Sequence, residues 1–212
     1  MNGDSGRAEP VGIDLVAPEV FAPMLRKLAL AALGVGVGVT LLSAIWLSWL
    51  PALVLGLVVA VPTIGYVFAF GRRRMWLSGT VIHAHRLVGE RRIDLAAATG
   101  VQLLVFPGRL SRIVLRVTAG ADTQLVPLAM YTDADSGREL HLLGLRKLAD
   151  ALAASELAAA VAISEVLVQQ LRAEARDAGL TERPLYRGVR LVRAKDAVSP
   201  VVLSDTEVAE LG

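Results

Sequence analysis

Two closely spaced histidines are the residues most able to bind a metal ion. His83 and His85 lie in WLSGTVIHAH, a stretch whose β-branched residues favour a strand. Alternate residues of a strand project from one face, so both imidazoles are expected on the same side of a sheet. Zinc sites need three or four ligands, and His141 is the one other histidine, so a site would also require a carboxylate such as Asp94. We favour surface histidines, and keep an enzyme that uses His83, His85 or Asp94 as an alternative.

A pair of acids offers a second chemistry. Asp133 and Asp135 have a spacing that can hold a metal beside phosphates. They also precede an expected helix start, where carboxylates stabilise the N-terminus without any metal. The motifs GxGxxG, GxxxxGK(S/T) and GxSxG are absent, and the chain has no cysteine. The sequence therefore predicts no enzyme, no cofactor and no metal site.

A long apolar segment dominates the first third of the chain. From Leu28 through Gly71 there are 44 residues without Asp, Glu, Lys, Arg or His. One crossing of a bilayer needs about 20 apolar helical residues, so the segment predicts two spans. We expect helices at Leu28–Leu50 and Ala52–Phe70 with a break near Pro51, since proline suits a turn or a first helical turn. A buried hairpin of a soluble protein or a cleaved signal peptide fits this length less well.

The residues that flank this segment predict its orientation. Trp46 and Trp49 fall near the turn, where indole rings favour the membrane interface. The basic residues stand at the other ends of the spans: Arg26 and Lys27 before the first, and Arg72, Arg73 and Arg74 after the second. Basic flanks prefer the cytoplasm, so we expect a multi-pass protein of the plasma (inner) membrane with both termini cytoplasmic. The same residues could attract anionic lipid headgroups, whereas a net charge of +2 argues against nucleic acid.

Small residues in the first span predict a packing face. Gly34 and Gly38 lie four positions apart in GVGVG, on one side of a helix. Such spacing permits close approach of a second helix. The partner is either the second span, which offers Gly56, Ala60 and Gly65, or a neighbouring chain, which would make a homo-oligomer or a larger complex.

The pattern changes from helical to alternating after the arginines. We expect about five antiparallel strands between Met75 and Met130, separated by turns rich in glycine. The capping-box spacing of Ser136 and Glu139 predicts that a helix begins there. Leucines at 142, 145, 148 and 152 recur at helical intervals and should face the sheet. A second helix is expected over residues 155–178, ended by Gly179.

Three segments carry a resemblance to a known family. They read WLSGTVI at Trp76–Ile82, RRIDL at Arg91–Leu95 and LRKLADAL at Leu145–Leu152, after the apolar hairpin. This order resembles small bacterial, actinobacterial-type membrane proteins with a PH-like domain, over residues 25–153. The resemblance implies a β-rich module closed by a C-terminal helix at the cytoplasmic face, and it carries no catalytic residue. Five strands in place of seven leave open a truncated sheet, a sheet completed by a dimer, or another small α+β fold.

Four segments follow from these patterns. We expect a flexible leader at 1–24, a transmembrane α-helical hairpin at 25–74, a cytoplasmic PH-like α+β domain at 75–179 and a C-terminal tail at 180–212. The tail carries five basic residues, at 183, 187, 190, 193 and 195, and it either lies on the inner leaflet or is solvated. The expected function is a membrane-anchored module that binds a protein or lipid headgroups. The alternatives are an accessory subunit of a larger membrane complex and an enzyme with an unrecognised site.

Overall fold

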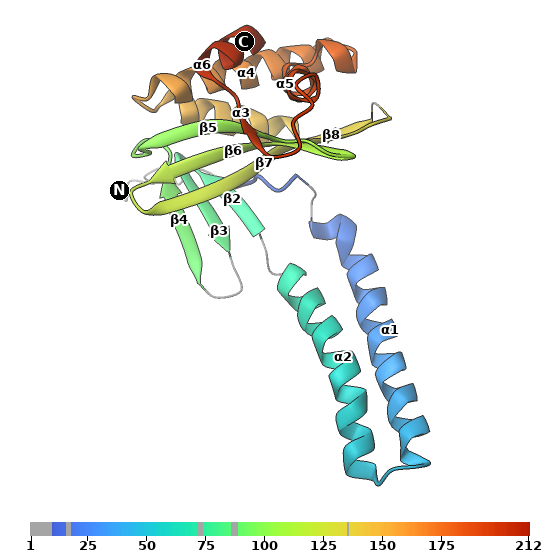
Figure 1. Cartoon of the computed structure of the whole chain (residues 1–212). Coiled ribbons are helices and arrows are strands. Elements are labelled where there is room, and N and C mark those ends of the chain that lie inside the picture. The colour runs from blue at the N-terminus through green and yellow to red at the C-terminus, as the bar shows by residue number, and fades with distance from the viewer. Residues whose placement is uncertain (1–9, 16–17, 72–73, 86–88, 135) are drawn as a thin grey trace, which may run out of the picture. The chain divides into compact units, whose positions relative to one another are not determined.

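The chain folds as two compact units. The computed structural model describes residues 10–15, 18–71, 74–85, 89–134 and 136–212. One unit contains the two long helices, and the other is an α+β domain that includes Met75–Ala84 and Glu90–Gly212 (Figure 1).

Two apolar helices form the hairpin. Helix α1 (Pro18–Ala44) and helix α2 (Trp49–Gly71) contain windows, Pro23–Ala44 and Trp49–Val67, that are long and apolar enough to cross a membrane. Only 6% and 17% of these windows are buried, unlike the core helix of a soluble protein. The break between the helices falls at residues 45–48, a few residues before its predicted place near Pro51, so Trp49 and Leu50 begin α2 instead of ending the first helix. Proline is tolerated in the first turn of α2, so it does not end a helix there.

A four-stranded antiparallel sheet begins the domain. Its order is β1-β2-β3-β4, with β1 at Val11–Gly12, β2 at Arg74–Ser78, β3 at Val81–His85 and β4 at Glu90–Asp94. The stretch WLSGTVIHAH is a hairpin rather than one strand, because Gly79 adopts a positive φ of 61° between β2 and β3. Six strands therefore lie between residues 74 and 132, where about five were expected.

Part of the predicted leader belongs to this sheet. Val11 and Gly12 pair with Leu77 and Trp76 of β2, so the chain before α1 and the chain after α2 are neighbouring strands. The Asp14 carboxylate accepts hydrogen bonds from the Met75 N–H at 3.2 Å. The predicted leader at 1–24 is therefore wrong over its described part, since it contains β1 and the start of α1; residues 1–9 lie outside the described part of the chain.

A five-stranded antiparallel sheet follows. Its order is β8-β7-β6-β5-β9, with β5 at Gly100–Phe106, β6 at Leu110–Ala119, β7 at Asp122–Thr132, β8 at Gly137–Glu139 and β9 at Val201–Val202. The pairing of β6 with β7 shifts at Ile113/Val114, opposite Pro127. Strand β8 pairs only with Ala129–Tyr131, so it does not reach Pro127. The proline thus lies at an irregularity of the sheet, where its missing N–H is tolerated.

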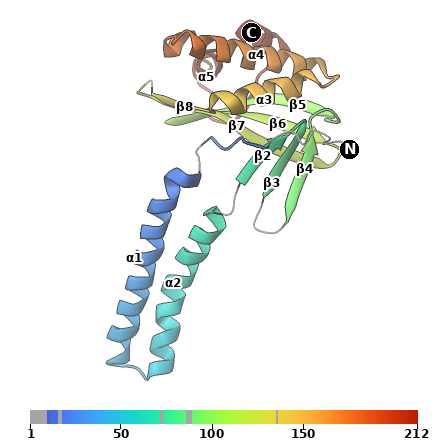
Figure 2. The same cartoon turned by 180° about the vertical axis from the view of Figure 1, so that it is seen from behind.

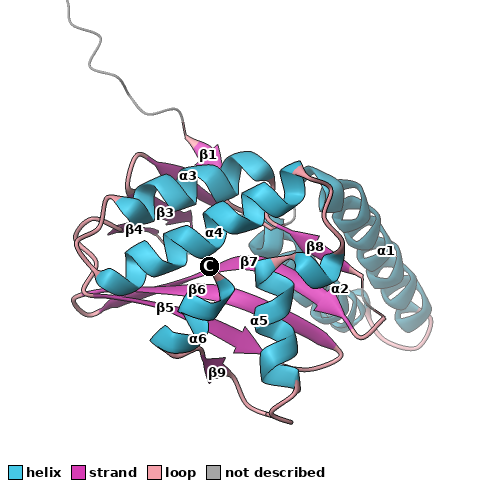
Figure 3. Cartoon of the chain, turned by 90° about the horizontal axis from the view of Figure 1, so that it is seen from above, coloured by secondary structure: helices cyan, strands magenta, loops and turns pink. Residues whose placement is uncertain are grey.

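Helices cover one face of the five-stranded sheet (Figures 1 and 3). They are α3 (Leu142–Ala153), α4 (Ala158–Ala175), α5 (Pro184–Arg193) and α6 (Asp205–Leu211), with a 3₁₀ turn at Leu180–Glu182. Leu145, Leu148 and Leu152 of α3 are fully buried, as their spacing predicted, whereas Leu142 is 50% exposed, so the prediction is wrong for that residue. The predicted helix start at Ser136 is wrong: Gly137–Glu139 is strand β8, and α3 begins at Leu142 (Figure 2).

The predicted C-terminal tail is part of the domain. Buried side chains from this segment, Leu185, Tyr186, Val189, Val192, Leu203, Val208 and Leu211, join the same apolar core as strands β5–β7. Helix α5 packs on the sheet closely enough that a Cβ added at Gly188 would lie 3.4 Å from Ile113 Cδ1. Residues 180–212 are therefore a folded end of the α+β domain, which extends beyond its predicted limit at residue 179.

Candidate functional site

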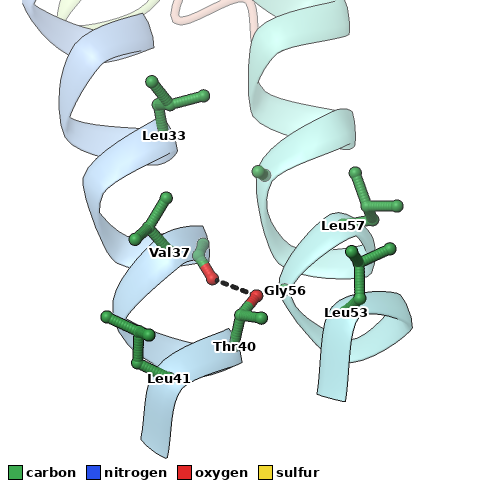
Figure 4. A pocket seen from close by; sticks show the side chains of 9 residues that line it. Leu33, Val37, Thr40, Leu41, Leu53, Gly56 and Leu57 are labelled. Carbon is green, nitrogen blue, oxygen red and sulfur yellow. Dashed lines mark hydrogen bonds between the residues drawn. The ribbon is translucent and has the colours of Figure 1, made fainter. Parts of the chain in front are cut away.

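The hairpin is held together by small residues on facing sides of α1 and α2. A Cβ added at Gly36 would lie 2.8 Å from the Ala60 Cβ, closer than real Cβ contacts come, and 3.0 Å from the Gly56 carbonyl oxygen, which is also tight. A Cβ at Gly56 would in turn overlap Thr40 Oγ1. The Thr40 hydroxyl donates to the Gly36 carbonyl at 2.9 Å, which satisfies it within its own helix (Figure 4). Close approach of backbones is the usual means of helix association in lipid.

The glycines predicted to pack do not face the second span. A Cβ added at Gly34 or Gly38 would meet nothing within 4 Å. Gly34 and Gly38 share one side of α1, and Gly36 is two positions away from each, on the other side. The middle glycine of GVGVG therefore contacts α2, while the outer two remain open for a neighbouring chain.

A shallow apolar groove runs between the two helices (Figure 4). Its volume is about 290 Å³. The residues that line it are Leu33, Gly36, Val37, Thr40, Leu41, Leu53, Gly56, Leu57 and Ala60. Since Thr40 already bonds its own backbone, the groove offers a ligand surface for hydrocarbon only.

The predicted interface residues lie at the ends of the hairpin. Trp46 is 87% exposed and Trp49 is 70% exposed, both at the turn. Arg26 and Lys27 are exposed on α1 just before its charge-free part, and Arg74 is the exposed first residue of β2. Arg72 and Arg73 lie outside the described residues.

His83 is engaged in a small surface cluster on the four-stranded sheet. Its ring stacks on Trp76, with centroids 5.3 Å apart and planes 8° apart. Its Nδ1 lies 2.6 Å from Glu90 Oε1, and Arg92 bonds the same carboxylate. The hydrogen bonds from Arg92 and His83 lower the pKa of Glu90 to about 2, so this carboxylate stays ionised. His83 is thus a paired residue and not an open metal ligand.

The other candidate ligands have separate structural roles. Asp94 accepts a hydrogen bond from the Ala96 N–H, and His141 stands at the N-cap of α3. His85 is exposed at the end of β3. Asp133 forms an ion pair with Arg193 at 3.2 Å, whereas Asp135 lies outside the described residues. Within the described ranges no three His, Asp or Glu side chains gather where they could hold a metal ion.

A buried polar cluster was missed at the sequence level. The Glu139 carboxylate, whose side chain is 8% exposed, accepts from Tyr131 Oη at 2.5 Å, Gln170 Nε2 at 2.7 Å and Arg183 Nη1 at 2.6 Å. Gln170 also accepts from the Leu185 N–H at 3.1 Å. The cluster therefore joins β7, β8, α4 and the start of α5. Gln170 was the residue in the sequence that could have revealed this cluster. A glutamine on the apolar face of a helix is buried, and a buried amide needs a hydrogen-bond partner.

The pKa shifts in this cluster keep its hydrogen bonds and its ion pair in place, as expected of a structural role. Burial and the adjacent Glu139 charge raise the pKa of Tyr131, which keeps its hydroxyl a donor. Burial acts to lower the pKa of Arg183, but the hydrogen bond and charge of Glu139 outweigh it and raise that pKa. Burial, and then Glu139, raise the pKa of Glu174, whose Oε2 is buried with no hydrogen-bond partner among the described residues.

Most basic residues of the C-terminal segment bind within the domain. Arg183 bonds Glu139, Arg187 donates to the Glu210 carbonyl at 2.8 Å, and Lys195 pairs with Glu207. Arg193 donates to Ser111 Oγ at 3.0 Å besides its ion pair with Asp133. Four of the five basic side chains therefore bond within the fold, which argues against both predicted alternatives, a segment on the inner leaflet and a solvated tail.

The geometry thus offers a tightly packed apolar hairpin and a domain in which His83, Asp94 and Asp133 are engaged in structural contacts. Neither arrangement by itself names a substrate. Family models, curated proteins and solved structures were all compared with this chain, and none of them matches it.

Proposed function

We propose that this chain is an integral membrane protein whose hairpin anchors a non-enzymatic α+β interaction module at the cytoplasmic face of the plasma membrane. The observation that carries the proposal is the pairing of β1 with β2, which brackets the hairpin. Gly12 precedes α1 and Trp76 follows α2, yet the two are partners in one sheet. A chain that enters and leaves a bilayer on the same side must cross it an even number of times, so the pairing supports a hairpin of two spans.

Charge distribution supports the cytoplasmic side. Arg26, Lys27 and Arg74 flank the hairpin at its open end, and the turn at residues 45–48 has no basic residue. Basic flanks are retained in the cytoplasm. Strands in two antiparallel sheets followed by α3 are also the order expected of a PH-like domain, and we propose that relationship on this basis.

The absence of cysteine from the chain makes the topology directly testable. Ser48→Cys places a thiol at the turn, and Val198→Cys places one at a residue that is 96% exposed in the domain. A membrane-impermeant maleimide added to intact spheroplasts should label residue 48 only, and both sites after lysis. Extraction of the wild-type chain by alkaline carbonate, or labelling of residue 198 in intact cells, would overturn the proposal.

A second candidate function is an accessory subunit of a larger membrane complex. The open glycines Gly34 and Gly38 favour it, because α2 does not occupy their side of α1. Replacing both with leucine should abolish co-purification of a partner. Gly65→Leu is the matched control on α2, where an added Cβ also meets nothing within 4 Å. Equal recovery of the partner with all variants would reject this role.

A further inference from the structure

The five-stranded sheet has one face that the helices do not cover. Ile113 faces α5, since a Cβ at Gly188 would lie 3.4 Å from it, and the Tyr131 ring meets the Tyr186 ring edge-on at 5.1 Å. Side chains alternate along a strand, so the residues between these point to the opposite face. That face is here called the outer sheet face. It is formed by Gln102, Leu104 and Phe106 of β5; Leu110, Arg112, Val114, Arg116 and Thr118 of β6; Thr123, Leu125, Pro127 and Met130 of β7; and Arg138 of β8.

This face combines apolar surface with unopposed positive charge. Three arginines, Arg112, Arg116 and Arg138, lie on it, and no Asp or Glu does. The acidic residues of β7 and β8 do not neutralise these arginines, because Asp122 pairs with Arg91 and Glu139 accepts a hydrogen bond in the buried cluster. Arg109 adds a fourth positive charge in the turn between β5 and β6.

The arginines lie between apolar neighbours. In one cross-strand row Arg112 stands between Phe106 and Met130, and Arg138 is the next residue beyond Met130. The Arg112 guanidinium lies 5.3 Å over the Phe106 ring, which holds it along the sheet. Arg116 occupies a parallel row between Gln102, which it bonds, and Leu125, which is 43% exposed.

We propose that the outer sheet face docks on the anionic lipid surface of the membrane that holds the hairpin. Charge complementarity selects this partner, because the cytoplasmic leaflet is negative and attracts arginines near its surface. The short connection between the hairpin and the domain also favours this partner. Strand β2 begins at Arg74, three residues after α2 ends at Gly71, so an anchored hairpin would keep the domain close to the lipid surface at all times. Flanking apolar side chains such as Leu125 and Met130 suit the headgroup region. This inference rests on the proposed membrane anchoring.

The test uses the full chain in lipid nanodiscs with a single fluorescent label. Leu125→Cys puts the label on the outer sheet face, and Val161→Cys puts it on α4, at a residue of similar exposure, 47% against 43%. The discs contain a headgroup nitroxide quencher in either purely zwitterionic lipid or lipid with phosphatidylglycerol. We expect quenching at residue 125 in the anionic discs, much less in zwitterionic discs, and little at residue 161 in either. Equal quenching at both sites, or none that depends on anionic lipid, overturns the proposal.

Charge variants identify the residues responsible. Changing Arg112, Arg116 and Arg138 together to Gln should shift the docked-to-free ratio by about fivefold per arginine, whereas changing all three to Lys should preserve it. If the Gln variant does not fold, the labelled Leu125→Cys chain with its three arginines intact still decides the matter, because 1 M salt must release the label at residue 125. A face that instead binds an acidic protein would leave residue 125 unquenched, and this counts against the proposal.

A third label separates this inference from the anchoring on which it depends. Trp46→Cys at the hairpin turn should report lipid in the same discs. Lipid contact at residue 46 without contact at residue 125 rejects the docking alone. No lipid contact at residue 46 rejects the anchoring as well.

Discussion

The Arg183 guanidinium donates to the Glu139 carboxylate at 2.6 Å across 44 positions of sequence. This bond connects the short strand β8 to the start of α5, and Tyr131 and Gln170 complete the shell around the carboxylate. This nearly buried carboxylate therefore serves to attach the C-terminal helices to the sheet.

Loss of Arg183 should destabilise the domain strongly. Arg183→Met leaves the nearly buried Glu139 carboxylate without its counter-ion, which costs about 3 kcal/mol of unfolding free energy. The control is Arg187→Met, whose side chain is exposed and bonds only a backbone carbonyl. Urea denaturation of the full chain in mild detergent, followed by near-ultraviolet circular dichroism of the buried tyrosines, measures both. Similar midpoints for the two variants would contradict a special role for Arg183.

The stability of the domain should depend on pH through Glu174. Burial and the Glu139 charge raise its pKa above the ordinary value of 4.5, while Arg183 opposes them. The folded state then binds the proton more tightly than the unfolded state, so this contribution is fully present below pH 4.5 and is lost as pH rises through the folded pKa. Glu174→Gln removes the ionisable carboxyl, and with it the loss of stability that accompanies the rise in pH. The variant should be more stable than wild type at neutral pH, and the two should converge in acid; parallel stability profiles would refute the assignment.

Gly137 should not accept a side chain. A Cβ there would lie 2.6 Å from Tyr131 Cε1 and 3.0 Å from the Met130 carbonyl oxygen. Tyr131 is fully buried and cannot move aside, so Gly137→Ala should cost about 1–3 kcal/mol. Gly100→Ala is the matched control on β5, where the nearest atom to an added Cβ is Thr118 Cβ at 3.9 Å. The same denaturation measurement compares the two, and a neutral Gly137→Ala would show that β8 can shift.

The hairpin should separate when Gly36 is enlarged. Gly36→Val adds three carbon atoms against Ala60 and Gly56, whereas Gly34→Val extends into open space. The measurement is disulfide formation between cysteines placed at Val37 and Leu53, which line the same groove. Crosslinking in membranes should be fast in the wild-type background and with Gly34→Val, and slow with Gly36→Val. Equal rates in all three would mean that the small residues do not hold the helices together.

Much of the architecture was readable from the sequence because strong local signals determine it. A charge-free stretch of 44 residues predicts two apolar helices, and alternation predicts strands. The buried leucines of α3 follow from their spacing. The error at Ser136 has a physical reason: Ser-x-x-Glu also occurs where a turn meets a strand, and the buried partners of Glu139 come from residues 31 and 44 positions later.

The C-terminal segment was misread despite a usable signal. Leu185, Tyr186, Val189 and Val192 have the spacing of one helical face, and all are buried in α5. The arginines between them led to the prediction of a tail, either solvated or lying on the inner leaflet. Whether such arginines pair with Glu139, Asp133 or a lipid is decided by tertiary contacts, which periodicity does not contain.

The pairing of β1 with β2 also has a consequence for biosynthesis. When the ribosome has made Val11 and Gly12, their partners Trp76 and Leu77 are still more than sixty codons away. The whole hairpin must therefore be synthesised before the first sheet can close. Under the proposed anchoring, the apolar helices are available for membrane insertion before the domain is complete.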